Sequence, residues 1–337
     1  MVDVAIQNIT GYAGLSAGLL LSDHPEFKLV AVSGRADAGR MLSDVFPLWS
    51  SSRDLRIETS VPAVDLVLCA LPHGAAAAAI VPLRTAGSKV VDISADFRLR
   101  DASTYATWYG EHPAPEMLAS AVYGLPEWRR SEVATAGLVG NPGCYPTASI
   151  LSIAPALEAG LIEPFITIDA KSGVSGAGRG LSLGTHFSEV NESVSAYGLS
   201  GHRHTPEIEQ ELSAVAGSPV EIIFTPHLIP MTRGMLVTCY ARLTRPVTSQ
   251  ELLELYRERY RNEPFVRILD SSPSTKWTSG TNLCLIHPTV SARGSHMIVL
   301  GAIDNLVKGA AGQAIQNANL MFGFPETLGL DRPVVFP

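Results

Sequence analysis

Cysteine is scarce in this sequence. The 337 residues include only Cys69, Cys144, Cys239 and Cys284, which are widely spaced and form no Cys-x-x-Cys pair. This spacing argues against a zinc knuckle and against a disulfide scaffold. It is typical of a protein of the reducing cytoplasm, which is the location we predict.

Long apolar runs and basic tracts are also missing. The longest apolar stretches, such as residues 75–83, are too short to span a bilayer, and the first residues carry no basic region typical of a signal peptide. The sequence has 25 Lys and Arg against 32 Asp and Glu, a net charge of −7, and no basic cluster stands out. We therefore expect a small-molecule substrate and no nucleic-acid or membrane partner.

The composition is that of a compact globular protein. Hydrophobic residues make up 46% of the chain and charged residues 17%. A chain of 337 residues is longer than one hydrophobic core normally organises, so two domains are expected.

The stretch around Cys144 points to a reactive thiol. Residues 141–147 (NPGCYPT) follow an apolar run at 136–139 and precede apolar residues at helical spacing from Ile150 to Leu161. The Pro-Gly pair predicts a turn, which places Cys144 at or near the N-terminus of a helix. Backbone N–H groups there favour a thiolate and can stabilise an oxyanion. The sequence predicts a nucleophile at Cys144, and a buried structural thiol is the alternative.

The N-terminal residues predict a dinucleotide-binding domain. A strand at residues 2–9, a tight turn at 10–14, a helical run and a second strand at 27–33 follow one another. Asn8 stands where the fingerprint usually has its first glycine, and asparagine tolerates positive φ. The second strand ends in Ser33-Gly34-Arg35, which suits a 2′-phosphate and predicts NADP over NAD. A glycine-rich turn without a cofactor is the alternative.

Two later strands end in polar loops. Residues 64–71 are followed by Pro72-His73-Gly74, and residues 89–93 by a segment that runs from Ser94 to Arg98. Ligands lie beyond the carboxyl ends of strands in doubly wound sheets, so we expect site residues in both loops. Arg98 is a candidate anion clamp, with a surface ion pair as the alternative.

The second half of the chain predicts a mostly antiparallel sheet that carries helices. Strands are expected at residues 165–170, 220–226, 235–243, 265–269 and 297–302, and helices at 250–260 and 305–321. A glycine-rich loop at 172–180 includes Arg179. His202 and His204 precede a helix that Thr205 is expected to cap, and no third metal ligand follows at a convincing spacing. We therefore expect no metal site and assign the histidines as a base for the thiol.

Six segments together resemble the N-acetyl-γ-glutamyl-phosphate reductase family, the arginine-biosynthesis branch of the semialdehyde dehydrogenases. They are NPGCYPT (141–147), SGVSGAGR (172–179), HRHTPEI (202–208), TPHLIPMTRG (225–234), TKWTSGTNLC (275–284) and DNLVKGAAG (304–312). The sequence departs from the family's pattern at Asn8, where glycine is usual. The resemblance implies an α/β protein with an N-terminal Rossmann-type NADP-binding domain, an α+β catalytic domain and a C-terminal helix that returns to the first domain. The implied domains are residues 1–143 with 305–337, and residues 144–304, which would also mediate oligomerisation.

The sequence patterns and the resemblance together give the predicted site residues. The catalytic set is Cys144, His202 and His204, and the sequence does not decide which histidine is the acid–base. The cofactor-binding set is Thr10, Gly11, Tyr12, Ala13, Gly14, Ser33, Arg35, Leu71, Pro72, His73, Ser94, Ser175, Gly176, Asn305 and Lys308. The substrate-binding set is Arg98, Asn141, Arg179 and Glu207, with Ser175 as a further candidate for binding phosphate or carboxylate.

The implied reaction is an NADPH-dependent reduction of an acyl phosphate to a semialdehyde through a Cys144 thioester, in a homodimer or homotetramer. Three alternatives remain. They are the lysine-biosynthesis reductase that acts on a carrier-bound aminoadipyl phosphate, aspartate-semialdehyde dehydrogenase, and a catalytically inactive NADP-binding regulator. The acidic chain lacks an obvious basic face for an acidic carrier, and a regulator has no need of the cysteine with both histidines.

Overall fold

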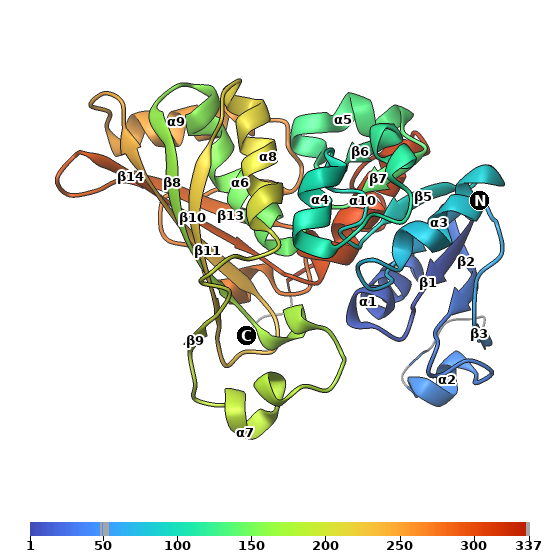
Figure 1. Ribbon diagram of the computed structural model, residues 1–337. Coiled ribbons are helices and arrows are strands. Elements are labelled where there is room, and N and C mark those ends of the chain that lie inside the picture. Colours follow the sequence, from blue (N-terminus) through green and yellow to red (C-terminus); the bar gives the residue numbers. More distant parts are fainter. Residues whose placement is uncertain (48, 50–53, 335–337) are drawn as a thin grey trace. The chain divides into compact units, whose positions relative to one another are not determined.

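A computed structural model describes residues 1–47, 49 and 54–334 (Figure 1). The chain divides into two compact units, the first formed by Met1–Gly143 with Ala310–Asp331 and the second mainly by Cys144–Gly309. No helix in the described part of the chain is long and apolar enough to cross a membrane.

The first unit is built on a seven-stranded sheet in the order β3-β2-β1-β4-β5-β7-β6. Every pair of neighbouring strands is parallel. The strands are β1 (Val2–Gln7), β2 (Phe27–Ser33), β3 (Ile57–Glu58), β4 (Leu66–Cys69), β5 (Lys89–Asp92), β6 (Ala121–Tyr123) and β7 (Leu138–Gly140). The helices are α1 (Tyr12–Leu21), α2 (Leu42–Val45), α3 (Ala76–Thr85), α4 (Ala102–Tyr109), η1 (Pro115–Ser120), α5 (Pro126–Thr135) and α10 (Gly312–Met321).

The strand order is that of a doubly wound nucleotide-binding fold, with the direction of winding reversed between β1 and β4. The C-terminal helix α10 belongs to this unit. Its Gln313 and Asn317 both donate hydrogen bonds to the carbonyl of Gly124, at 2.8 Å each. The predicted Rossmann-type domain and the predicted return of the last helix are therefore confirmed.

The second unit has a mixed seven-stranded sheet in the order β12-β13-β14-β11-β8-β10-β9. Its strands are β8 (Ile162–Ser172), β9 (Ser195–Ala196), β10 (Glu221–Leu228), β11 (Met235–Leu243), β12 (Val266–Ile268), β13 (Cys284–Val290) and β14 (His296–Ile303). Its helices are α6 (Cys144–Glu158), η2 (Val174–Ala177), η3 (Leu183–Thr185), α7 (Phe187–Val190), α8 (Thr205–Ala216), α9 (Ser249–Arg259) and η4 (Thr275–Thr278). The π turn η5 (Val307–Ala311) begins in this unit and ends in the first. Most neighbouring pairs are antiparallel, as expected, while β8/β10 and β12/β13 are parallel.

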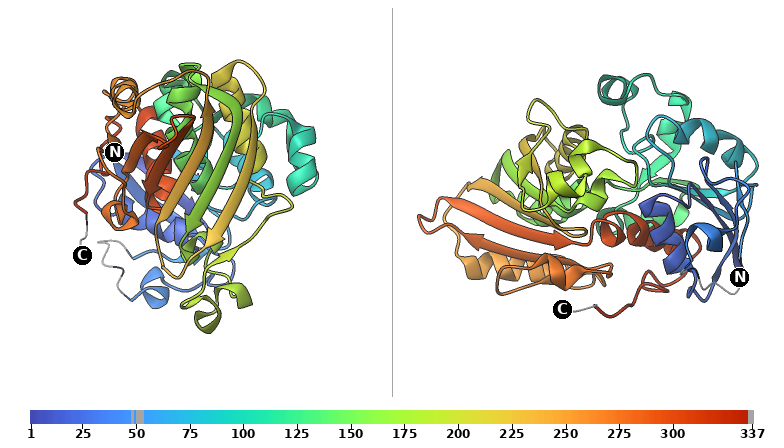
Figure 2. Two further views of the ribbon diagram at one scale, coloured as in Figure 1. Left: turned by 90° about the vertical axis from the view of Figure 1, so that its left-hand side faces the viewer. Right: turned by 90° about the horizontal axis from the view of Figure 1, so that it is seen from below.

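One face of this sheet carries the helices. Helix α6 contacts β11 and β14, and α8 and α9 pack beside it. Every residue of α6 from Tyr145 to Leu157 is buried, which explains the apolar run that follows the cysteine. The strands of this sheet are seen face-on in the left view of Figure 2. Phe165, Ile223 and Tyr240 of the sheet are exposed.

Several expected boundaries need correction. The first strand ends at Gln7 rather than residue 9, because Asn8 turns the chain at φ 62°. His204 rather than Thr205 is the N-cap of α8, and no side chain makes the capping bond. The helix expected at 305–321 begins with the π turn η5 and continues as α10. Strand β13 was not predicted, because Pro288 within an apolar run argues against a strand.

Candidate active site

Cys144 is the first residue of α6 and is half-buried. Strand β7 ends at Gly140, and the Asn-Pro-Gly turn leads directly into the helix. The predicted position of the thiol at a helix N-terminus is therefore confirmed. Backbone N–H groups in the first turn of a helix have no partner within the helix and favour an anion.

Cys144 lines a pocket of about 340 Å³ together with the other two predicted catalytic residues, His202 and His204. The pocket is lined by Cys144, Tyr145, Ser172, Gly173, Gly176, Ala177, Ser182, Gly184, Thr185, Tyr197, His202, His204 and Leu228. Tertiary structure thus brings the histidines, which lie some sixty residues further along the chain, to the cysteine. Such a volume is enough for a small metabolite.

The two histidines differ in their surroundings. The Nδ1 atom of His202 accepts a hydrogen bond from the backbone N–H of His204 at 3.1 Å, so the neutral ring carries its proton on Nε2. Burial, and secondarily the charge of Arg203, lowers the pKa of His202 to about 4. His202 is therefore uncharged at neutral pH. The rings of the two histidines meet edge to face, with centroids 4.9 Å apart.

Aromatic side chains that the sequence did not single out form one wall of this pocket. The hydroxyl groups of Tyr145 and Tyr197 are 3.0 Å apart, and both rings contact His202 edge to face. Burial raises the pKa of both tyrosines, so both hydroxyls stay protonated and can donate hydrogen bonds. Tyr145 lies within the NPGCYPT segment (residues 141–147). Tyr197 lies in the long connection between β8 and α8, and only the folded structure brings it to the pocket.

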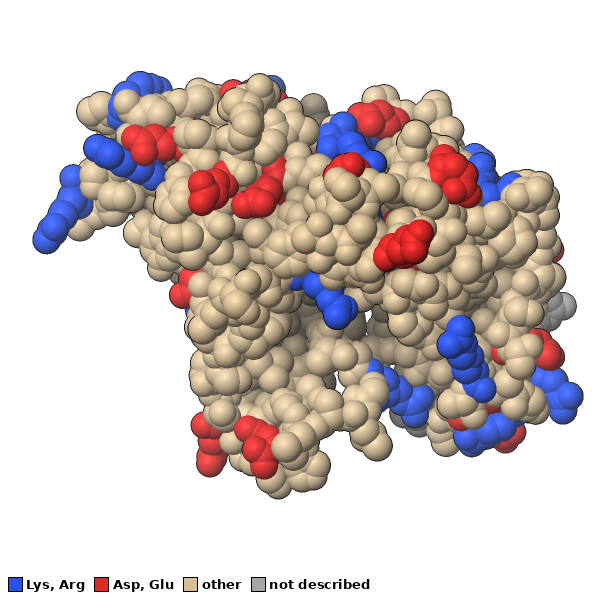
Figure 3. Space-filling view, in the orientation of Figure 1, with Lys and Arg blue, Asp and Glu red and all other residues tan. Residues whose placement is uncertain are grey.

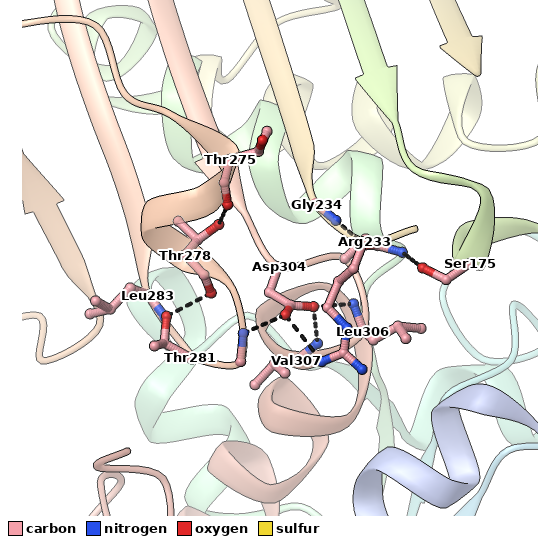
Figure 4. A network of polar contacts seen from close by, with 12 residues as sticks. Ser175, Arg233, Gly234, Thr275, Thr278, Thr281, Leu283, Asp304, Leu306 and Val307 are labelled. Carbon is pink, nitrogen blue, oxygen red and sulfur yellow. Dashed lines mark hydrogen bonds and ion pairs between the residues drawn. The ribbon is translucent and has the colours of Figure 1, made fainter. Parts of the chain in front are cut away.

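The glycine-rich loop after β8 forms another wall. Gly176 lines the pocket, and Ser175 behind it accepts a hydrogen bond from Asn305 Nδ2 at 3.0 Å (Figure 4). Arg179 is exposed at the end of this loop. Lys308 is fully buried in the same unit, with its Nζ 5.7 Å from the centre of the Phe265 ring. Glu207, in the first turn of α8, is also buried.

A second pocket, of about 120 Å³, lies at the carboxyl ends of the strands of the first unit. Its lining is Gln7, Asn8, Ser33, Gly34, Arg35, Thr59, Ser60, Leu71, Ala75 and Ala79. Ser33, Arg35 and Leu71 were predicted as cofactor residues. Thr59 and Ser60 were not, because β3 before them has only two residues and leaves no periodic signal.

The glycine-rich turn fits a phosphate group. Asn8 adopts φ 62°, and its Nδ2 donates a hydrogen bond to the carbonyl of Ala70 at 2.8 Å, which joins the ends of β1 and β4. A Cβ atom on Gly14 would lie 2.2 Å from the Asn8 carbonyl oxygen, so only glycine permits this close turn. Helix α1 begins at Tyr12, and its N-terminal N–H groups favour an anion. The serine and threonine hydroxyls and the Arg35 guanidinium of the pocket suit an adenosine 2′-phosphate.

The loops after β4 and β5 are joined to each other. The backbone N–H of Ala95 donates to His73 Nδ1 at 2.9 Å. The carboxylate of Asp96 accepts the N–H groups of Gly74, Ala76 and Ala77 at the start of α3. Ser94 is buried and donates its hydroxyl to Asp92 at 2.7 Å. These bonds hold the ends of the two strands in a fixed arrangement.

Arg98 is buried at the ends of β5 and β7. Its Nε donates to the carbonyl of Asn141 at 2.7 Å and its Nη2 to the carbonyl of Ile93 at 2.8 Å. The Asn141 side chain donates to the carbonyl of Ala310 and accepts from Asn317, so it is held within the first unit. Both residues therefore support the turn that precedes Cys144.

On the face drawn in Figure 3, acidic and basic side chains are interspersed. No group of three or more possible metal ligands was found in the part of the chain that the structure describes.

Two family models match the chain. The semialdehyde dehydrogenase NAD binding domain matches residues 3–136, and the semialdehyde dehydrogenase dimerisation domain matches residues 144–305. The N-acetyl-gamma-glutamyl-phosphate reductase of Dehalococcoides mccartyi is 51% identical over 335 residues, which is 98% of each chain. That of Pelotomaculum thermopropionicum is 51% identical over 345 residues, covering 100% of this chain and 99% of the relative. The chain belongs to the N-acetyl-γ-glutamyl-phosphate reductase family. The predicted resemblance is confirmed.

Solved structures agree with the fold of this reductase family. An aspartate semialdehyde dehydrogenase II from Vibrio cholerae, complexed with ASA, aligns with a TM-score of 0.74 over 96% of this chain and 98% of that one, at 15% identity. An aspartate semialdehyde dehydrogenase with NADP from Candida albicans aligns with a TM-score of 0.70 at 16% identity, over 96% of this chain and 98% of that one. At such identities the likeness concerns the fold alone, which is the semialdehyde-dehydrogenase fold that we predicted.

Proposed function

We propose that this chain reduces N-acetyl-γ-glutamyl phosphate to N-acetylglutamate 5-semialdehyde in arginine biosynthesis, with NADPH as the reductant and release of inorganic phosphate. One observation carries the proposal. The thiol of Cys144 begins α6 in a pocket that also contains His202 and His204. The substrate follows from relatives of that name that are 51% identical over nearly the whole chain.

Cys144 is the nucleophile. Its thiolate attacks the carbonyl carbon of the acyl phosphate, a sulfur–carbon bond forms, and the bond to the phosphate oxygen breaks to leave a thioester and inorganic phosphate. The N-terminal N–H groups of α6 stabilise the thiolate and the oxyanion of the tetrahedral species. Sulfur suits both steps because it is a good nucleophile and a good leaving group. Bound NADPH supplies the hydride that takes the thioester to the aldehyde level.

His204 is the acid–base. It takes the thiol proton when Cys144 is activated and returns a proton to the sulfur when the carbon–sulfur bond breaks and the semialdehyde departs. His202 is unsuited to this role, because its low pKa keeps it unprotonated at neutral pH and its Nδ1 already accepts the His204 N–H. His202 instead contributes a neutral Nε2–H donor to the pocket.

The substrate pocket is suited to an acylated amine. Among the described residues that line it, none is an aspartate or a glutamate, so a free ammonium group would have no carboxylate partner there. One of the hydroxyls of Tyr145 and Tyr197 donates to the other, and the hydrogen of the second can be donated to an amide or carboxylate oxygen. For the anionic groups of the substrate we retain Arg98, Ser175 and Arg179, with Asn141 and Glu207 supporting the site.

Cofactor binding is assigned to the first unit, where Ser33, Arg35 and Leu71 line the nucleotide pocket and the turn from Thr10 to Gly14 opens α1. We retain Pro72, His73, Ser94, Gly176, Asn305 and Lys308 as further cofactor residues. The proposed domains are residues 1–143 with 305–337 for NADP, and residues 144–304 for catalysis.

The dimerisation-domain match supports association between copies of the chain. We propose a homodimer or homotetramer, which sedimentation would distinguish. All four cysteines lie in the described part of the chain and none is in a disulfide, which supports the proposed cytoplasmic location.

The reverse reaction tests the function. N-acetylglutamate semialdehyde and NADP⁺ are mixed with the enzyme, with and without phosphate, and NADPH absorbance is followed. We expect a signal that depends on phosphate and disappears in Cys144→Ser. Binding of NADP without such a signal would refute the proposal and favour a carrier-bound substrate or a regulator.

A further inference from the structure

Several of the characteristic segments of this chain meet at one buried carboxylate, that of Asp304 (Figure 4). They are the turn that contains Arg233, the segment of residues 275–284 and the segment that begins at Asp304 itself. Neither Asp304 nor Arg233 is among the described residues that line the thiol pocket, so the reaction above assigns them no part.

Both oxygens of this carboxylate accept two donors although Asp304 is fully buried. Its Oδ1 accepts the backbone N–H groups of Leu306 at 2.9 Å and Val307 at 3.1 Å. Its Oδ2 accepts the backbone N–H of Gly280 at 2.7 Å and Nη1 of Arg233 at 3.2 Å. A buried charge that loses a partner is strongly destabilised. These contacts therefore hold the three segments in one arrangement.

The next residue extends the network to the pocket. Asn305 Oδ1 accepts the backbone N–H of Gly234 at 2.7 Å, and its Nδ2 donates to Ser175 Oγ at 3.0 Å. Ser175 precedes Gly176, which lines the thiol pocket. The glycine-rich wall of the pocket is thus attached to the same residues.

The π turn η5 follows directly. The backbone N–H of Gly309 donates to the carbonyl of Asp304, five residues earlier, at 3.0 Å. This spacing is that of a π-helix, a rare conformation that is frequent at functional sites. The Asp304 side chain binds the first N–H groups of the same turn, so it determines where the turn begins.

Gly309 packs against the backbone of the catalytic cysteine. A Cβ atom on Gly309 would lie 2.7 Å from Cys144 Cβ and 3.2 Å from its Cα, with Ile303 Cδ1 3.3 Å away. Cα and Cβ of Cys144 are not the end of a flexible side chain, so they cannot move aside without displacing the start of α6. The position of the π turn and the position of Cys144 are therefore coupled.

We propose that Asp304 and Arg233 are positioning residues for the Cys144 nucleophile, which they hold in place through the π turn and Gly309. The inference rests on the proposed role of Cys144. The effect of helix-terminal N–H groups on an anion falls off within the first turn, so a displaced Cys144 would form less thiolate. A misplaced sulfur would also attack its substrate less well.

The test measures the thiol directly, on the full chain without cofactor or substrate. Iodoacetamide alkylation is followed by intact mass between pH 6 and pH 10 in wild type, Gly309→Ala, Asp304→Asn and Arg233→Gln. Cys69, Cys239 and Cys284 are fully buried, and Cys144→Ser supplies the background rate. We expect each variant to react several-fold more slowly at pH 7 and to approach the wild-type rate at pH 10. In turnover, kcat should fall roughly 10- to 100-fold with KM little changed.

Two variants serve as controls. Gly301→Ala places a Cβ 2.1 Å from Ser152 Oγ and so crowds the same helix about two turns beyond Cys144. Arg242→Gln removes an exposed arginine of the sheet, which pairs with Glu163 at 3.6 Å. Both should alkylate like wild type. If Asp304→Asn does not fold, Arg233→Gln, which leaves the three backbone donors of the carboxylate in place, still tests the proposal.

Alkylation at the wild-type rate or faster in the test variants would overturn the proposal, because simple loosening increases access to the thiol. Equal effects of Gly301→Ala and Gly309→Ala would overturn it as well. A raised KM in Arg233→Gln with unchanged alkylation would instead make Arg233 a substrate contact. Turnover that survives in Cys144→Ser would refute the proposed function and would leave the alkylation comparison valid.

Discussion

The Nδ1 atom of His202 accepts a hydrogen bond from the backbone N–H of His204, 3.1 Å away. This bond gives the two histidines of one short loop different surroundings. It leaves His202 as a neutral ring that presents Nε2–H, and in the proposed reaction His204 is the residue that exchanges protons. The sequence did not distinguish the two.

The first prediction concerns this pair. His204→Asn should lower kcat by about 10²- to 10⁴-fold, the usual contribution of an acid–base. His202→Asn should cost much less, because the asparagine oxygen can still accept the His204 N–H. Steady-state kinetics and thermal unfolding of both variants check the prediction. Equal losses of kcat at unchanged stability would contradict it.

The pH profile provides a control for this assignment. The pKa of His202 is lowered to about 4, so its charge does not change between pH 6 and pH 8. His202→Asn should therefore leave any acid limb in that range where the wild type has it. A limb that moves or disappears in this variant would assign the titrating group to His202.

The second prediction concerns Asn8. In Asn8→Asp the side chain still tolerates the positive φ, but an ionised carboxylate cannot donate to the Ala70 carbonyl. In Asn8→Gly the residue can still adopt the positive φ, but the side-chain donor is missing. Asn8→Gly should lower the free energy of unfolding by about 0.5–1.5 kcal/mol, the net value of one hydrogen bond, and Asn8→Asp should lower it further, because a carboxylate oxygen would face the Ala70 carbonyl oxygen. Asn8→Ala should lose a further ~1–2 kcal/mol relative to Asn8→Gly, because alanine is disfavoured in the left-handed region. Denaturant unfolding measures the free energy of unfolding of each variant, and calorimetric titration measures its affinity for NADP. An Asn8→Gly variant with wild-type stability and NADP affinity would show that the side chain is dispensable.

The third prediction concerns cofactor choice. Arg35→Leu removes the only guanidinium among the described residues that line the nucleotide pocket. A charged hydrogen bond to an anion contributes ~1.5–3 kcal/mol, so NADP affinity should fall about 10- to 100-fold while NAD affinity is unchanged. Fluorescence titration with both nucleotides checks the result.

Arg40→Leu is the matched control for Arg35→Leu. Arg40 is exposed and binds Asp37 at 2.9 Å, and it does not line the pocket. Its loss should leave both affinities unchanged. Equal losses of NADP and NAD affinity in Arg35→Leu would mean that Arg35 does not select the 2′-phosphate.

The fourth prediction concerns a buried carboxyl group at the end of β5. Burial, reinforced by the charge of Asp96, raises the pKa of Asp92 from 3.8 to about 7. Between these values the folded protein holds a proton at this site that the unfolded chain has lost, so stability falls as pH rises towards 7. Asp92→Asn removes this loss. When pH is raised from 5 to 8, the free energy of unfolding of the variant should increase by ~2–3 kcal/mol relative to that of wild type.

Urea unfolding of the variant and of wild type at pH 5 and at pH 8 measures how the difference between their free energies of unfolding changes with pH. An unchanged difference between variant and wild type across this range would show that Asp92 is ionised in the folded protein at pH 5.

Local sequence decided the features that depend on a few neighbouring residues. The strand–turn–helix–strand start was predictable because its periodicity and its glycines act within about thirty residues. The start of α6 at Cys144 was predictable because a Pro-Gly turn and an apolar helical run adjoin it. Strand β11 was predicted with its observed bounds, Met235–Leu243, because its alternation is long and regular.

Tertiary structure decided what depends on which segments meet. Thr59 and Ser60 line the nucleotide pocket because β3 pairs with β2. A strand of only two residues has no sequence pattern from which this pairing could be predicted. Tyr197 lies in the long connection between β8 and α8 and lines the thiol pocket only in the folded chain. The backbone N–H of Gly280 donates to Asp304, which is 24 residues further along the chain. Local propensities carry no information on such approaches, because hydrogen bonds and burial between distant segments arise only when the whole sheet forms. The sequence alone therefore predicted the reaction class and the position of Cys144 at a helix N-terminus, and only the folded chain gave His202 and His204 different hydrogen bonds and placed Gly309 against Cys144.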